Sequence, residues 1–177
     1  MLFQNEASWT LFWVNCIIYT VLVVVRAWVD VVIPERYFRP ERWWFRTREW
    51  ERDGDVYRSL LRIDRWKDRL PALDTWHRFS KKRLADANHH YLRRFITETC
   101  RAESNHLRAV GSVVLMRLWT PLDLWMTCLL IAVAGNLPFI LIQRYNRPRL
   151  QRILGRMERR ELATATEGDG ELSPATA

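Results

Sequence analysis

The sequence is poor in cysteine and has none of the common motifs of enzyme active sites. Its three cysteines cannot all pair with one another, and Cys16 and Cys128 lie in apolar runs. A small buried thiol is the ordinary interpretation of such residues, so we predict neither a disulfide framework nor a cysteine metal site. The sequence also lacks His-x4-Asp, Gly-x-Ser-x-Gly, Walker and dinucleotide-binding patterns. These absences exclude the most familiar hydrolases and nucleotide-binding enzymes.

Charge is missing from two long stretches of the chain. Trp9 to Val25 contains no charged residue, and neither does Leu124 to Ile142. A helix needs about 20 mostly apolar residues to cross a bilayer, and a chain of 177 residues has no comparably apolar shell in which to bury such helices. No basic residue precedes the first run, which disfavours a cleaved signal peptide. We therefore predict one N-terminal transmembrane helix that ends before Pro34.

Basic residues are distributed asymmetrically around these runs. None precedes the first run, 19 lie between Ile33 and Arg108, and seven arginines follow the last run. Basic flanks favour the cytoplasm, so we predict an outside N-terminus, with the middle region and the C-terminus in the cytoplasm. The second apolar block then forms a membrane hairpin that turns at Thr120–Asp123. A single crossing by Leu124–Ile142 is the alternative, and it would put one basic stretch outside.

The overall pattern predicts an all-α, small integral membrane protein of the cell membrane. The aromatic and arginine-rich stretch after Ile33 is typical of amphipathic helices at the lipid interface, and we predict no nucleic-acid partner. Leu61–Pro71 predicts a turn or short strand, and Ser80–Arg108 one long helix. Residues 1–163 form a single predicted domain, followed by a polar, disordered tail over 164–177.

The segment before the second apolar block contains the densest group of candidate catalytic side chains. Glu98, Glu103 and His106 share one broad helical face, and Glu103 and His106 are i, i+3 neighbours that can touch. A carboxylate that orients an imidazole suits general-base catalysis. A plain surface Glu–His pair is the alternative. Glu-x-x-His is also half of a di-metal motif, but the chain lacks a second copy, so we predict no metal.

Polar residues also interrupt the end of the last apolar run. Asn136 lies inside this run, where a polar side chain usually faces a protein interior or a cavity. Arg144, Arg147 and Arg149 follow at its exit. Arginines in this arrangement can bind a phosphate or carboxylate bidentately; simple anchoring at the lipid interface is the alternative.

Four motifs occur in a familiar order along the chain. They are IPERYF (Ile33–Phe38), WKD-x-LP (Trp66–Pro71), ETCRAESNH (Glu98–His106) and NLPFILIQRYNRPRL (Asn136–Leu150). On these motifs the chain resembles the glycosyl-4,4'-diaponeurosporenoate acyltransferase family of staphyloxanthin-type carotenoid biosynthesis. The resemblance implies a membrane acyltransferase that esterifies the sugar hydroxyl of a glycosylated carotenoid or related glycolipid with a fatty acyl chain. The donor is then an acyl thioester of coenzyme A or acyl carrier protein, with no bound cofactor.

The resemblance suggests roles for the residues of these motifs. We hypothesise that His106 takes the hydroxyl proton, that Glu103 or Glu98 orients it, and that Arg101 binds the donor or the oxyanion. The expected substrate-binding residues, among which the three arginines would hold donor phosphates, are Asn136, Gln143, Arg144, Tyr145, Asn146, Arg147, Arg149, Trp66 and Lys67. A non-catalytic membrane scaffold of a carotenoid or glycolipid pathway is the main alternative function, and a subunit of a lipid transporter is another.

Overall fold

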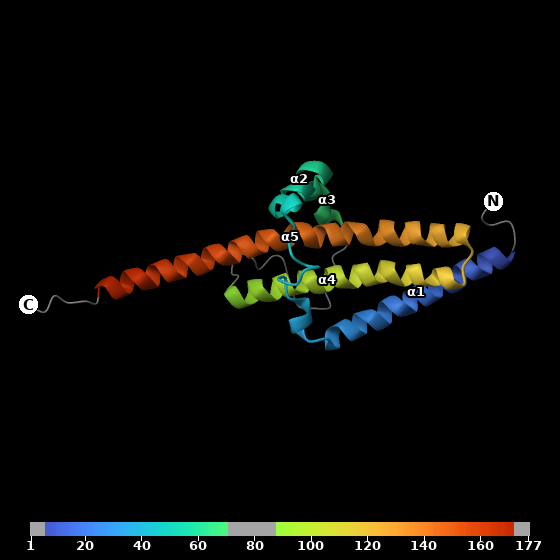
Figure 1. The fold of residues 1–177 in the computed structure, drawn as a ribbon, viewed down its shortest axis with the longest axis horizontal. Coiled ribbons are helices and arrows are strands. Elements are labelled where there is room, and N and C mark those ends of the chain that lie inside the picture. Colours follow the sequence, from blue (N-terminus) through green and yellow to red (C-terminus); the bar gives the residue numbers. More distant parts are fainter. Residues whose placement is uncertain (1–5, 71–87, 172–177) are drawn as a thin grey trace, which may run out of the picture.

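Three long helices form the body of the protein (Figure 1). The structure, a computed structural model, describes residues 6–70 and 88–171. The long helices are α1 (Glu6–Val32), α4 (His89–Leu115) and α5 (Leu122–Glu171). The described residues contain no strand, so the all-α prediction is confirmed for them. By length and composition, α1 and α5 are apolar enough to cross a membrane.

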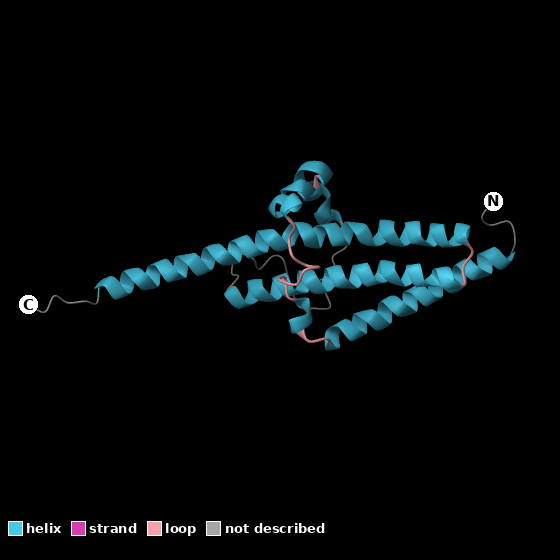
Figure 2. Ribbon diagram, viewed as in Figure 1, coloured by secondary structure: helices cyan, strands magenta, loops and turns pink. Residues whose placement is uncertain are grey.

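Among the described residues between α1 and α4 there are five short helices, of which η2 and α2 contact α5 and η1 contacts α4 (Figure 2). They are η1 (Glu35–Phe38), η2 (Glu49–Gly54), α2 (Asp55–Leu61), α3 (Ile63–Trp66) and η3 (Lys67–Arg69). A short strand after Leu61 was one of our two expectations, and it is wrong. Arg62 has a left-handed backbone (φ 48°) that ends α2 and lets a second helical turn begin at Ile63.

α4 and α5 form an antiparallel hairpin (Figure 1). α4 is followed by the short helix η6 (Met116–Leu118), and α5 starts after Pro121, close to the predicted turn at Thr120–Asp123. Of the predicted helix from Ser80, the structure describes the part from His89, and α4 extends past Arg108 to Leu115. The first eight residues of that prediction lie outside the described residues.

α1 has an unusual distribution of side chains. Its two buried residues, Asn15 and Asp30, are polar, whereas large apolar residues such as Trp13 and Trp28 are exposed. Asn15 Nδ2 donates to Thr120 Oγ1 over 3.0 Å, and Asp30 forms an ion pair with Arg108. Polar contacts therefore attach α1 to the hairpin at two levels.

α5 contacts both the short helices and α4. Gly54 has a φ of 91°, and a Cβ there would lie 3.1 Å from the Tyr145 carbonyl oxygen. Glycine therefore allows both the left-handed turn and the close approach to α5. At its far end, α5 continues past Thr164, the predicted start of the tail, to Glu171. The predicted domain boundary does not coincide with the end of this helix, and residues 172–177 lie outside the described residues.

Candidate functional site

His106 and Asn136 meet between α4 and α5. His106 Nδ1 lies 2.9 Å from Asn136 Oδ1. The imidazole also stacks on Phe139, one turn along α5, with ring centroids 4.9 Å apart and an interplanar angle of 8°. The two contacts fix both the position and the plane of the ring.

The hydrogen bonds of Asn136 determine the tautomer of His106. Asn136 Nδ2 donates to the Tyr19 hydroxyl over 2.9 Å and to the Ala132 carbonyl oxygen over 2.7 Å. Asn136 Oδ1 is therefore the acceptor in the contact with His106, and Nδ1 must carry the proton. His106 Nε2 is then the unprotonated nitrogen, and it makes no hydrogen bond to a described residue. The residue is half-buried, so a substrate can approach the ring.

Burial affects the charge of this imidazole. Desolvation lowers the pKa of His106 below its usual value, and the hydrogen bond with Asn136 opposes this effect only in part. The ring is therefore neutral at neutral pH, as a general base must be before it takes a proton.

A second polar group lies beside this pair at the α1 interface. Arg108 forms an ion pair with Asp30, and Arg26 is close enough to interact electrostatically with Tyr19, Asp30 and Arg108. Within the described chain, three buried atoms here have no hydrogen-bond partner: Arg26 Nε, Arg26 Nη2 and Asp30 Oδ2. Unpaired buried donors and acceptors are costly unless a ligand satisfies them. Our sequence predictions missed these residues, although charges at the end of an apolar run were a signal.

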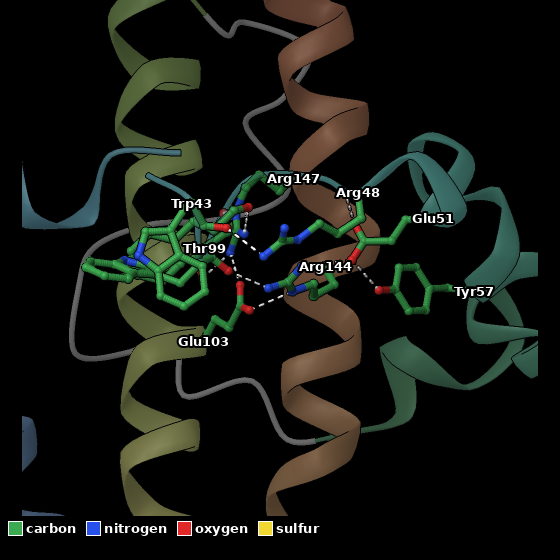
Figure 3. A network of polar contacts seen from close by, with 10 residues as sticks. Trp43, Arg48, Glu51, Tyr57, Thr99, Glu103, Arg144 and Arg147 are labelled. Atoms are coloured by element: carbon green, nitrogen blue, oxygen red, sulfur yellow. Dashed lines mark hydrogen bonds and ion pairs between the residues drawn. The ribbon is translucent and has the colours of Figure 1, made fainter. Parts of the chain in front are cut away.

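Glu103 does not contact His106, contrary to the predicted pair. Its Oε1 accepts from Arg144 Nε over 2.6 Å and its Oε2 from Arg147 Nη2 over 2.5 Å (Figure 3). Arg144 also donates to Glu51 Oε1 over 2.7 Å. Glu51 and Glu103 are each 1% exposed, so two buried carboxylates are neutralised by two arginines.

All three guanidinium nitrogens of each arginine in this network donate to protein groups. Arg147 donates to Thr99 Oγ1, to the Phe45 carbonyl oxygen and to Glu103, and Arg144 also donates to the Trp44 carbonyl oxygen. The contacts fasten the loop between η1 and η2 to the hairpin. Arg144 and Arg147 therefore already pair with buried carboxylates, and the phosphate-binding role stays a prediction for both.

Tyr57 and Cys100 lie beside this network. Burial, together with the charge of Glu51, raises the pKa of Tyr57 above its usual range, so its hydroxyl stays protonated and donates to Glu51 Oε1 over 2.9 Å. Burial also raises the pKa of Cys100 to about 11. A thiol that remains protonated is a poor nucleophile, which argues against a covalent acyl-cysteine.

The other predicted site residues are placed in three groups. Glu98 forms an ion pair with Arg101 over 2.7 Å, and the Arg101 guanidinium lies 5.0 Å from the ring centroid of Phe38; neither reaches the imidazole. Arg149 is exposed and contacts Tyr145. The remaining predicted residues are half-buried and lie elsewhere: Trp66, Lys67, Gln143 and Asn146. Trp66 Nε1 donates to the Leu61 carbonyl oxygen over 2.9 Å.

Two open depressions flank the loop after α1. One has a volume of about 460 Å³ and is lined mainly by apolar and aromatic side chains, with Ser104, Leu107 and Arg108 at one side. The other, of about 690 Å³, is lined by Arg36, Tyr37, Arg39, Glu41 and Arg42. The described residues contain no group of three or more potential metal ligands.

Comparison with known proteins gives a consistent family. Residues 41–156 match the family model of glycosyl-4,4'-diaponeurosporenoate acyltransferase. A protein of that name from Staphylococcus aureus (strain bovine RF122 / ET3-1) is 28% identical over 148 residues, which cover 82% of this chain and 89% of the relative. The proteins of that name from strains N315 and USA300 are each 28% identical over 150 residues, with the same coverage. No solved structure matches the chain significantly.

Proposed function

Because the chain belongs to the glycosyl-4,4'-diaponeurosporenoate acyltransferase family and is an acyltransferase, we propose that it transfers a fatty acyl chain to a sugar hydroxyl of a glycosylated carotenoid. The single observation that carries this proposal is the His106–Asn136 contact, which leaves Nε2 of a neutral imidazole free to act as a base. The arrangement is built from helices rather than loops, so the base is held rigidly.

The reaction needs one proton shuttle and one acyl transfer. The sugar hydroxyl gives its proton to His106 Nε2 while its oxygen bonds to the carbonyl carbon of the acyl thioester. When the tetrahedral intermediate collapses, the carbon–sulfur bond breaks, and the leaving thiolate takes the proton from His106. Asn136 positions the imidazole throughout, and the unpaired N–H groups of Arg26 are suited to the negative charge that develops on the carbonyl oxygen.

The reaction takes place at a bilayer in this proposal. Many large apolar side chains of α1 are exposed, whereas Asn15 and Asp30 are buried, which is the reverse of a helix on a water-soluble protein and is typical of a helix facing lipid. The N-terminus lies outside, and the α4–α5 hairpin enters from the cytoplasm. In this orientation Asn15 and Thr120 lie toward the outer side, and Asp30 and Arg108 toward the cytoplasmic side. A carotenoid can then lie along the helices with its sugar near His106.

The test is mass spectrometry of pigment and polar-lipid extracts from cells that produce the glycosylated carotenoid. Cells with the wild-type chain should contain a product heavier by one fatty-acyl residue, and cells with His106→Ala should accumulate the unacylated glycoside. His90→Ala, an exposed histidine on the same helix, is the control and should make product normally. Equal product from His106→Ala and wild type, at equal protein level, would refute the role of this base. Identical extracts with and without the chain would refute the proposed function.

A further inference from the structure

We propose that Arg36, Arg39 and Arg42, beside η1, bind the phosphate of the acyl donor. This inference rests on the proposed function and identifies where its donor is held. The three side chains line an open depression of about 690 Å³ with Tyr37 and Glu41. Three positive charges against one negative charge give this surface the sign that a phosphate requires.

These arginines are not neutralised by carboxylates. Among the described residues, none of the three forms an ion pair, in contrast to Arg144 and Arg147. Two of the guanidinium groups, those of Arg36 and Arg42, lie over aromatic rings instead. Arg36 and Arg42 lie 5.3 and 5.4 Å from the centroid of Tyr37, and Arg42 lies 5.5 Å from that of Trp44. Stacking uses the face of a guanidinium and leaves the N–H groups at its edge free for phosphate oxygens.

The depression adjoins a second one that suits the remainder of a donor. Tyr37 lines both, and the neighbouring groove of about 460 Å³ is mainly apolar and aromatic. Its lining includes Leu107 and Arg108, which directly follow His106. Arg108 binds Asp30, and Arg26 lies close to both. An acyl thioester whose phosphate lies at the three arginines therefore has an adjoining apolar groove for its chain, and this groove reaches Leu107 and Arg108.

The same chemistry is present in the head group of an anionic phospholipid. We assign the arginines to the thioester donor because the groove leads from them toward the candidate site, as an acyl chain bound for His106 requires. A lipid anchor would need only charge at the surface and no such groove. A site for the thioester donor should bind soluble coenzyme A without lipid, whereas an anchor for anionic phospholipid should not.

The experiment compares two triple variants of the full chain in detergent. Arg36→Gln/Arg39→Gln/Arg42→Gln removes the proposed site. Arg58→Gln/Arg65→Gln/Arg69→Gln removes the same charge from exposed arginines of the other short helices. Binding of coenzyme A is measured by equilibrium dialysis, and elution in size-exclusion chromatography verifies that each variant is folded. We expect the first variant to bind coenzyme A at least about tenfold more weakly than wild type and the control to bind it normally. With palmitoyl-coenzyme A, the first variant should show a KM raised by a similar factor and a nearly unchanged kcat.

The outcomes separate this inference from the proposed function. Loss of coenzyme A binding in the first variant supports the site even if no ester forms on a carotenoid. Equal binding by both variants and wild type, or no binding by wild type, overturns it while leaving acyl transfer standing. If the first variant binds coenzyme A normally but loses affinity for vesicles of phosphatidylglycerol, the arginines are a lipid anchor and the assignment to the donor is wrong.

Discussion

Asn136 Oδ1 lies 2.9 Å from His106 Nδ1, although the two residues belong to different helices. An uncharged amide therefore orients the candidate base, and no carboxylate of the described residues contacts the ring. The amide fixes the tautomer without adding a negative charge that would raise the basicity of the imidazole. Removing the amide should free the ring to change its tautomer and orientation, while the imidazole itself remains able to accept a proton.

Asn136→Ala should lower kcat by about 10- to 100-fold, because the ring loses its fixed tautomer but can still accept a proton. His106→Ala should cost more, about 100- to 10,000-fold. The measurement is acyl transfer in detergent with saturating donor. Gln151→Ala, a half-buried polar residue further along α5, is the control. Wild-type kcat in both site variants would show that His106 is not the base.

The fold was predictable because its signals are local. Two uncharged runs and the turn before Leu122 were enough to expect α1 and the hairpin. Asn136 was also correctly expected to face other protein groups, because an amide within an apolar run needs a partner. The full length of α5 was not predicted. The small and polar residues after Thr164 are typical of a disordered tail, yet α5 continues through them to Glu171.

The partners within the site were harder to predict. Spacing on one helix places Glu103 within reach of His106, but it does not show what the facing helix offers. In the structure, the register of the hairpin presents Arg144 and Arg147 to Glu103, and Asn136 to His106. The carbonyl oxygens of Trp44 and Phe45 that complete the network have no signature in sequence at all.

Glu103→Gln should destabilise the protein rather than impair chemistry alone. Breaking a buried ion pair leaves an uncompensated charge and costs about 3–5 kcal/mol. Here the charge left unpaired belongs to Arg147, which is 1% exposed. Thermal unfolding in detergent should therefore begin at a clearly lower temperature.

The matched control for this change is Glu158→Gln. Glu158 pairs with Arg93 over 2.8 Å, but both side chains are substantially exposed, at 41% and 67%. Such a pair contributes about 0–1 kcal/mol, so the control should unfold almost as wild type does. A Glu103→Gln protein that is as stable as wild type yet inactive would instead support the orienting role first expected for this carboxylate.

The dependence of activity on pH should reflect the buried imidazole. Burial lowers the pKa of His106 below 6.5, so the midpoint of the acid limb of kcat should lie below that of an ordinary histidine. Asn136→Asp places a carboxylate beside the ring and should raise this pKa, moving the acid limb to higher pH. A wild-type limb at or above 6.5 would contradict the assignment.

The stability of the fold should change with pH in a related way. The unfolded chain binds a proton on this histidine near pH 6.5, whereas the folded chain does so only at lower pH. The contribution of His106 to stability is therefore fully present above pH 6.5 and decreases as pH falls from there to the folded-state pKa. Thermal unfolding of wild type and His106→Gln should show this: the difference between their midpoints should depend on pH within that window and become constant outside it.

The orientation in the membrane can be tested with single cysteines. We expect a membrane-impermeant maleimide to label Glu6→Cys in intact cells, because the N-terminus is outside. Arg58→Cys and Thr164→Cys should be labelled only after the membrane is opened, because the basic middle region and the end of α5 lie in the cytoplasm. The native cysteines are buried or half-buried, so the unmodified chain provides the background.

The antiparallel packing of α4 against α5 is what requires Arg58 and Thr164 to behave alike. Labelling of one of these two sites in intact cells would mean that the apolar part of α5 crosses the membrane alone.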